Sequence, residues 1–167
     1  MPEFDFSVLK KKRVKFLVKL LEFRNFYTKM NIYFSCSITG GRNDQPVYAA
    51  IVQALLEDGH HVPTAILASP QVMDMEMVVD PREVYRRDVD WVQACDALIA
   101  EVSTPSHGVG YEIALALMLE KPVLACFRAG VPVSKMILGN DHPRFTSVMY
   151  RDAEEAVILI RDFLRGL

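Results

Sequence analysis

One short segment constrains the fold more than any other part of the chain. Residues 97–102 read Ala-Leu-Ile-Ala-Glu-Val, an almost uninterrupted apolar run of the length of one strand. Such a run is typical of a parallel sheet that helices cover on both faces. It is followed by a loop with two glycines, Gly108 and Gly110, and then by residues 109–120, which favour a helix. The segment therefore predicts a strand, loop and helix at the centre of an α/β fold.

The same alternation of strand and helix extends over most of the sequence. Asp80 and Pro81 supply a cap and a first-turn proline for one helix, and Gly59 ends another. Residues 65–80 have no clear period and predict a loop or a short helix. Strands are expected at 32–36, 60–64, 97–102, 122–127 and 145–150, and helices at 45–58, 81–95, 109–120 and 152–165. Right-handed crossovers then give a doubly wound, flavodoxin-like or Rossmann-like parallel sheet of five strands, with helices on both faces.

Charge divides the chain into two parts. The net charge is −2, from 19 Lys and Arg against 21 Asp and Glu. Residues 1–30 hold eight of the basic residues but three of the acidic ones, so the body holds 11 basic against 18 acidic residues. We therefore expect a basic N-terminal extension at residues 1–29, helical or disordered, and an α/β domain at residues 30–167.

Composition and motifs exclude several functions. The acidic body lacks the clustered cations that a nucleic-acid polymer requires, and the basic leader has no apolar stretch long enough for a membrane span. The three cysteines form no CxxC pair, which predicts free thiols in a reducing compartment, and we expect a cytoplasmic protein. The four histidines have no metal-ligand spacing, and no GxGxxG or Walker A loop is present. We therefore expect neither a metal nor a cofactor.

Two polar loops follow strands and are the candidates for ligand binding. Residues 37–42 read Ser-Ile-Thr-Gly-Gly-Arg, and residues 103–112 read Ser-Thr-Pro-Ser-His-Gly-Val-Gly-Tyr-Glu. Ligands of doubly wound sheets bind at the carboxyl ends of the strands, where the strand order reverses. Glycines let a ligand approach the backbone, and the free amides at a helix start attract anions. An ordinary strand-to-helix turn has a similar composition, so the loops alone leave both interpretations open.

Two carboxylates accompany these loops. Glu112 falls in the first turn of the expected helix, where it is either a helix-terminus charge or a nucleophile that the helix dipole keeps ionised. Asp88 lies near the apolar stripe of its helix, so it either pairs with Arg86 or Arg87 at the surface or points into a pocket. Two carboxylates in one cleft suit cleavage of a glycosidic bond, one attacking and one donating a proton.

Three segments carry a more specific signal. They are residues 33–42, residues 88–96 and residues 100–112, the last of which reads Ala-Glu-Val-Ser-Thr-Pro-Ser-His-Gly-Val-Gly-Tyr-Glu. In order and spacing they resemble the 2′-deoxynucleoside 5′-monophosphate N-hydrolases of the nucleoside 2-deoxyribosyltransferase superfamily. The resemblance implies hydrolysis of the N-glycosidic bond of a deoxynucleoside 5′-monophosphate, which releases a free base and 2-deoxyribose 5-phosphate.

The resemblance also implies catalytic roles. Glu112 would attack the anomeric carbon and form a glycosyl-enzyme intermediate. Asp88 would act as general acid for the departing base, and Tyr33 would orient the nucleophilic carboxylate. Residues 30–167 would then be the catalytic domain.

The implied substrate site is larger than these three residues. Ser134 and Met136 would reach the active site of a neighbouring subunit, which implies a homodimer with shared sites. Ile38 would flank the base. The positions implied for the 5′-phosphate and its loops are Ser37, Gly40, Arg42, Ser106, Gly108 and Gly110.

One position departs from the family pattern. The mammalian-type enzymes have an arginine where this chain has Thr39, although Arg42 could supply a replacement contact to phosphate. Three alternatives therefore stay open: a deoxyribosyltransferase that exchanges bases of unphosphorylated nucleosides, a CMP-type ribonucleotide N-glycosidase, and a nucleotide-binding module without turnover. The retained Ser37, Ser106 and Ser134 favour the deoxynucleoside monophosphate, and the sequence does not indicate the base.

Overall fold

The computed structural model of this chain describes residues 28–69 and 78–167. Apart from residues 28 and 29, the expected N-terminal extension lies outside the described residues. The same holds for residues 70–77, within the stretch for which the sequence predicts a loop or a short helix. No helix in the described part of the chain is long and apolar enough to cross a membrane.

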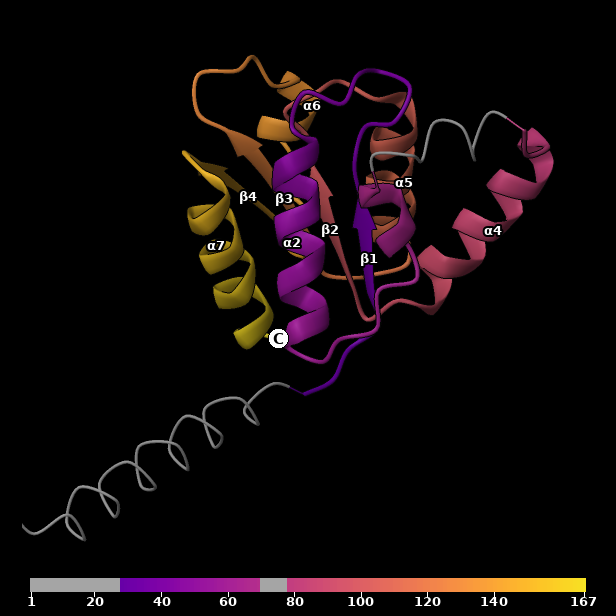
Figure 1. The fold of residues 1–167 in the computed structure, drawn as a ribbon, viewed down its shortest axis with the longest axis horizontal. Coiled ribbons are helices and arrows are strands. Elements are labelled where there is room, and N and C mark those ends of the chain that lie inside the picture. The colour runs from indigo at the N-terminus through magenta and orange to yellow at the C-terminus, as the bar shows by residue number, and fades with distance from the viewer. Residues whose placement is uncertain (1–27, 70–77) are drawn as a thin grey trace, which may run out of the picture.

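Four parallel strands form the sheet. They are β1 (Ile32–Ser35), β2 (Ala97–Glu101), β3 (Val123–Arg128) and β4 (Phe145–Tyr150), and they lie side by side in chain order. Figure 1 shows the four arrows running in one direction, with their carboxyl ends in the upper half of the view. Because the strands are parallel, the loops that follow β1 and β2 meet at the same edge of the sheet.

The prediction of a fifth strand at residues 60–64 is wrong. His61 makes an isolated parallel bridge with Asn31, and no strand forms there. Pro63 has no N–H group to donate, and the backbone N–H of Phe34 bonds instead to the side-chain oxygen of Thr64 at 2.9 Å. A hydroxyl therefore replaces the backbone carbonyl that a fifth strand would offer to β1.

Helices cover both faces of the sheet, as predicted. Helices α2 (Gln45–Glu57) and α7 (Ala153–Arg165) pack together on one face, next to the 3-10 helix η1 (Ala65–Ala68). Helices α4 (Pro81–Ala94) and α5 (His107–Met118) cover the other face, and the short helix α6 (Lys135–Leu138) follows β3. In Figure 1, α2 crosses in front of the strands and α5 lies behind them.

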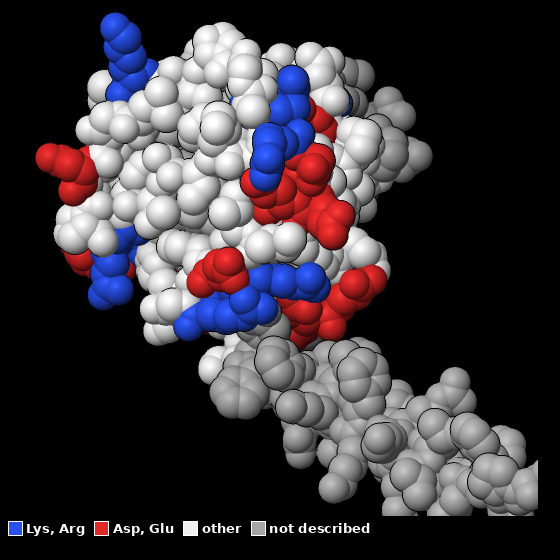
Figure 2. Space-filling model, turned by 90° about the vertical axis from the view of Figure 1, so that its left-hand side faces the viewer, with Lys and Arg blue, Asp and Glu red and all other residues white. Residues whose placement is uncertain are grey.

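Alternation along the strands separates two cores. Ile32 and Phe34 pack in the cluster of α2 and α7, whereas Tyr33 packs in the cluster of α4 and α5. Ser35 also faces α5, because its hydroxyl reaches Glu112. The three cysteines are free and buried, as the sequence predicts. The side of the molecule seen in Figure 2, which includes α7, carries small neighbouring groups of acidic and basic side chains and no continuous basic patch.

Candidate active site

A cavity of about 360 Å³ lies between α4 and α5. Asp88 from α4 and Glu112 from α5 both line it, although 24 positions separate them in the sequence. The rest of its wall is mostly apolar or aromatic and consists of Tyr85, Val89, Val92, His107, Gly108, Tyr111 and Leu115. The two carboxylates that the sequence singled out therefore line one mostly apolar cavity.

Glu112 is held in this cavity by the end of β1. The hydroxyl of Ser35 donates a hydrogen bond of 2.5 Å to Oε2 of Glu112. Tyr33 precedes Ser35 by two residues and lies on the same face of the strand, but its buried hydroxyl makes no hydrogen bond of ordinary geometry with any described residue. Ser35 therefore contacts Glu112 directly, and the Tyr33 phenol, for which the resemblance implies such a contact, lies beside the same carboxylate.

Opposing effects set the protonation of Glu112. Burial raises the pKa of the Glu112 carboxyl group, and hydrogen bonding with the Ser35 and Tyr33 hydroxyl groups lowers it. Asp88 raises the same pKa by charge repulsion, and the Arg87 guanidinium lowers it. Burial, together with the charges of Glu112 and Asp88, raises the pKa of the Tyr33 phenol, which therefore stays protonated. A hydroxyl donor next to Glu112 favours the ionised carboxylate that a nucleophile requires.

Asp88 pairs with a cation and lines the cavity at the same time. The Nε atom of Arg87 donates to Oδ1 of Asp88 at 2.9 Å, and the guanidinium of Arg87 lies 5.0 Å from the centre of the Trp91 ring. The Asp88 side chain is 18% exposed. The surface ion pair and the inward-facing carboxylate, which the sequence left as alternatives, therefore occur together.

Helix α5 begins at His107, two residues before the predicted start. Ser106 is its N-cap, and the hydroxyl of Ser106 accepts a hydrogen bond from the N–H of Val109 at 3.5 Å. Glu112 therefore lies in the second turn and not, as predicted, in the first. The dipole of a helix acts mainly on its first turn, so the Ser35 hydroxyl matters more for Glu112 than the dipole does. Gly108 and Gly110 lie inside this first turn rather than in the loop.

The two polar loops touch each other at the carboxyl ends of β1 and β2. A Cβ atom added to Gly40 would lie 2.5 Å from the carbonyl oxygen of Pro105 and 2.8 Å from the hydroxyl of Ser37. Any side chain at position 40 would therefore force the loops apart. The Ser37 hydroxyl is fully buried beneath this contact and has no hydrogen-bond partner among the described residues.

Arg42 braces the loop from the inside. Its guanidinium donates to the carbonyl oxygens of Leu67 at 2.8 Å, Ser69 at 2.9 Å and Ser37 at 3.4 Å, and it stacks 5.5 Å from the centre of the Tyr48 ring. These bonds direct its charge towards backbone carbonyls, which is a different role from the phosphate contact implied by resemblance. Thr39 is exposed, and Ile38 is partly buried against the core beside α2.

A second cavity of about 460 Å³ lies on the other side of the α5 start. Ser106, Gly110, Ser134 and Met136 line it, and none of them lines the cavity of the two carboxylates. Met136 is 83% exposed, and Ser134 caps α6 by accepting a 3.2 Å hydrogen bond from the N–H of Met136. Within one chain, the start of α5 thus separates these implied substrate contacts from Asp88 and Glu112.

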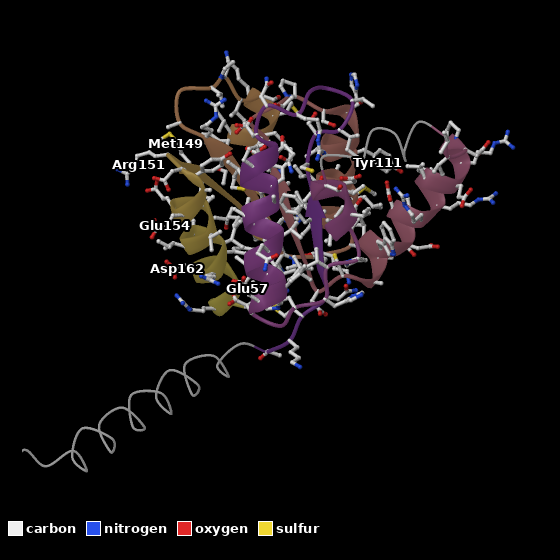
Figure 3. All side chains as sticks on the ribbon, in the orientation of Figure 1. Glu57, Tyr111, Met149, Arg151, Glu154 and Asp162 are labelled. Carbon is white, nitrogen blue, oxygen red and sulfur yellow. The ribbon has the colours of Figure 1, made fainter. Side chains whose placement is uncertain are left out.

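Sequence reasoning missed three residues of the carboxylate cavity and its surroundings. Ser35 was read as part of a strand, although the two-residue period places it on the same face as Tyr33. Tyr85 and Tyr111 form a pair with ring centres 6.1 Å apart and hydroxyl groups 3.2 Å apart. Figure 3 shows Tyr111 on the side of α5 that faces α4. No signal in the sequence indicated this pairing, because it depends on how the two helices pack.

Comparison with known proteins identifies relatives of this chain. The family model described as nucleoside 2-deoxyribosyltransferase matches residues 32–149. The 5-hydroxymethyl-dUMP N-hydrolase of Rattus norvegicus is 39% identical over 140 residues, which cover 80% of this chain and 84% of the relative. A protein of Methanosarcina mazei, provisionally named 2′-deoxynucleoside 5′-phosphate N-hydrolase 1, is 41% identical over 139 residues, 83% of this chain and 86% of the relative.

Among solved structures, a CMP N-glycosidase of Clostridium botulinum has a similar fold. The TM-score is 0.61 at 18% sequence identity, and the match covers 79% of this chain and 98% of the other. At this identity the likeness concerns the fold alone. The family match over residues 32–149 and the relatives of about 40% identity go further: this chain belongs to the nucleoside 2-deoxyribosyltransferase family.

Proposed function

We propose that this chain hydrolyses the N-glycosidic bond of 2′-deoxynucleoside 5′-monophosphates and releases a free base and 2-deoxyribose 5-phosphate. The observation that carries the proposal is the pair of carboxylates, Asp88 and Glu112, in one cavity, with Glu112 bonded to Ser35. The names of the relatives support the same reaction, since they are N-hydrolases of a deoxynucleoside 5′-phosphate and of 5-hydroxymethyl-dUMP.

The reaction proceeds in two steps on Glu112. In the first, a carboxylate oxygen of Glu112 attacks C1′ of the sugar while the bond from C1′ to the base nitrogen breaks. The bonding electrons leave with the base, which takes a proton from Asp88. In the second, water attacks C1′, its proton passes to the Asp88 carboxylate, and Glu112 leaves as a carboxylate. The chain's own residues supply the nucleophile and the proton, so the scheme uses no cofactor.

We further propose a homodimer in which Ser134 and Met136 complete the site of the neighbouring subunit. Two observations support it: these residues line a different cavity from Glu112 of the same chain, and Met136, which lines that cavity, is more than four-fifths exposed. Large exposed apolar side chains beside a cavity are typical of a protein interface. The three buried free thiols support a reducing, cytoplasmic compartment.

Base release tests the reaction directly. Glu112→Ala should abolish release of base from deoxynucleoside monophosphates, and Asp88→Asn should slow it strongly, when the products are separated by chromatography. Glu57→Ala, on the exposed side of α2, is the control and should react like the wild type. A Glu112→Ala chain that releases base at the wild-type rate would rule out the scheme.

Two further measurements separate the alternatives. A foreign free base added to the reaction yields a new nucleoside or nucleotide if the chain is a transferase, and free sugar phosphate if it is a hydrolase. Methanol added as a second acceptor gives a methyl glycoside with retained configuration if Glu112 forms an intermediate, and inverted product without one. Parallel assays with CMP and dCMP identify the preferred sugar.

A further inference from the structure

Outside the cavity of Asp88 and Glu112, β2 ends in a second carboxyl group that is fully buried, that of Glu101. Its Oε1 atom accepts hydrogen bonds from the Tyr150 hydroxyl at 2.8 Å, from the Ser103 N–H at 3.2 Å, and from the Ser103 hydroxyl. The hydroxyl of Ser103 in turn accepts a 2.7 Å bond from the N–H of Arg128. One carboxyl group thus connects the carboxyl ends of β2, β3 and β4, which lie next to each other in Figure 1.

The hydrogen bonds of Glu101 and Ser103 hold the start of the loop between β2 and α5 in place, in addition to joining the strands. Ser103 is the second residue after β2, and three residues later Ser106 caps α5. Pro105 lies between them and presses its carbonyl oxygen against Gly40, so the loop that carries Ser37 rests on the same segment. A displacement of Ser103 would therefore move both loops that bear the implied phosphate contacts.

We propose that Glu101 is a positioning residue for the substrate phosphate, because it fixes Ser103 and thereby the loop that carries Ser106 and supports Ser37. The proposal rests on the function proposed above and extends it to a residue with no contact to the reacting atoms. Glu101 faces the α2 side of the sheet, where it lies near Tyr48 rather than Glu112.

The geometry also indicates that Glu101 acts in its uncharged form. Its second oxygen, Oε2, is buried without a hydrogen-bond partner among the described residues, as is the neighbouring Tyr48 hydroxyl. A buried carboxylate oxygen with no donor is costly, whereas a protonated Oε2 carries no charge. Burial raises the pKa of Glu101, as does the charge of Asp44, while the Ser103 and Tyr150 bonds lower it.

Several other ionisable groups surround Glu101 and influence its titration. Arg128 on β3 is paired with Asp44, next to α2, at 2.8 Å, which reduces the influence of each on Glu101. The groups that face Glu101 from the elements packed around it are Cys36 after β1, Asp44 and Tyr48 at α2, Cys126 and Arg128 on β3, and Tyr150 on β4.

The decisive test compares two substitutions of Glu101 with a matched control in the full chain. Glu101→Gln keeps the acceptor and the shape of the protonated acid, whereas Glu101→Leu removes both. Glu154→Gln, on the outer side of α7 and far from the loops in Figure 3, removes one exposed carboxylate as the control. Ser103→Ala, which deletes one donor, serves as a milder variant if the Leu chain does not fold.

Binding of 2-deoxyribose 5-phosphate by calorimetry and kinetics with a deoxynucleoside monophosphate give the readouts. We expect the Leu and Ala variants to bind the sugar phosphate at least ten-fold more weakly and to raise KM by a similar factor. Their kcat should change less than three-fold, and their preference for the monophosphate over the nucleoside should fall. The Gln and Glu154 variants should match the wild type at a pH at which Glu101 is protonated, and the Gln variant should lack the loss of affinity that ionisation of Glu101 causes at higher pH.

Opposite results would overturn the inference. Folded Leu and Ala variants with wild-type affinity would show that Glu101 has no positioning role. A Gln variant as weak as the Leu variant would show that the charge, and not the hydrogen-bond network, holds the loop. A wild-type chain that does not bind 2-deoxyribose 5-phosphate would end the inference as well. Base release by the wild-type chain tests the proposed reaction separately, because the calorimetric measurement requires no turnover.

Discussion

The hydroxyl of Ser35 and the carboxylate of Glu112 form a 2.5 Å hydrogen bond across 77 positions of sequence. The bond joins the end of β1 to the second turn of α5, the two elements that contribute the loops of the candidate site. It also opposes the effect of burial on the pKa of Glu112. The nucleophile proposed for this chain therefore depends on a neighbour that its own helix does not supply.

Replacement of Ser35 should impair catalysis by raising the pKa of Glu112. In Ser35→Ala the carboxylate loses one hydroxyl donor, so a higher pH is needed to ionise it. A hydrogen bond to a charged group contributes about 1.5–3 kcal/mol, so kcat/KM near neutral pH should fall by about ten- to a hundred-fold. The acidic limb of the pH profile should move upward. Ser147→Ala, on an exposed position of β4, is the control, and an unchanged profile for Ser35→Ala would contradict the assignment.

Arg87 should influence the same titration through space. Its positive charge lowers the pKa of Glu112, so Arg87→Gln should raise that pKa and lower kcat/KM by about three- to ten-fold on the acidic limb. Arg86→Gln removes the same charge from the adjacent, exposed position of α4 and should have little effect. The difference between the two variants should shrink at high ionic strength, because salt screens exposed charges. Equal profiles for both variants would show that Arg87 has no special relation to the site.

Gly40 should be intolerant of any side chain. In Gly40→Ala the new Cβ atom would lie 2.5 Å from the Pro105 carbonyl oxygen, so one loop must shift. Such overpacking costs about 1–3 kcal/mol, and we expect KM for the monophosphate to rise about ten-fold. Gly166→Ala, whose Cβ would meet a backbone oxygen at 3.4 Å at the end of α7, is the matched control. If Gly40→Ala changed neither KM nor the free energy of unfolding, the loops that follow β1 and β2 would be able to separate at little cost in free energy.

Glu101, the buried acid at the end of β2, should make the free energy of unfolding depend on pH. Burial raises the pKa of Glu101 in the folded chain above its unfolded value of about 4.3. The folded state therefore binds this proton more tightly, and the resulting stabilisation is complete below the unfolded pKa and is lost as pH rises through the folded pKa. Urea unfolding at pH 5 and pH 8 should show that the free energy of unfolding of Glu101→Gln increases relative to that of the wild type as the pH rises. If the difference in free energy of unfolding between the variant and the wild type were the same at both pH values, the pKa of Glu101 would not change on folding.

Mixing two inactive variants should restore activity if the sites are shared. Glu112→Ala lacks the nucleophile, and Ser134→Asp keeps a capping side chain for α6 while its charge repels phosphate. In a mixed dimer, one site contains Glu112 from one chain and Ser134 from the other, both unchanged. Subunit exchange between the two variants should then restore about a quarter of the wild-type activity. No recovery, with exchange verified by mass spectrometry, would place Ser134 and Glu112 in independent sites.

Local sequence patterns predicted most of the fold. The apolar run at β2 and the Asp80–Pro81 start of α4 identified their elements, and the Asp80 side chain caps α4 with a 2.8 Å bond to the N–H of Arg82. The pattern failed at residues 60–64, where the short segment His-His-Val-Pro-Thr after Gly59 resembles a strand. Whether such a segment pairs depends on backbone donors and on what lies opposite, and here Pro63 and the Thr64 hydroxyl end the pairing.

The site was harder to predict than the fold. Glu112 and Asp88 stood out because their segments are distinctive in sequence. Ser35 and Tyr85 did not, since their roles depend on distances between elements that a sequence does not contain. The start of α5 was placed two residues late because Gly108 and Gly110 resemble loop residues, although the Ser106 cap includes both in the helix.

The first turn of α5 is a partition with a cavity on each side. His107 lines both cavities. Of the residues after it, Gly108, Tyr111 and Glu112 line the cavity of the carboxylates, whereas Val109, Gly110 and Ile113 line the other. Because a helix moves as a rigid body, a displacement of α5 on the side of Ser134 also displaces the side that carries Glu112. A substitution that displaces α5 away from one cavity will therefore move it towards the other and shift the carboxylate. Substitutions designed to change the substrate range of this chain therefore have to take into account that α5 forms a wall of both cavities.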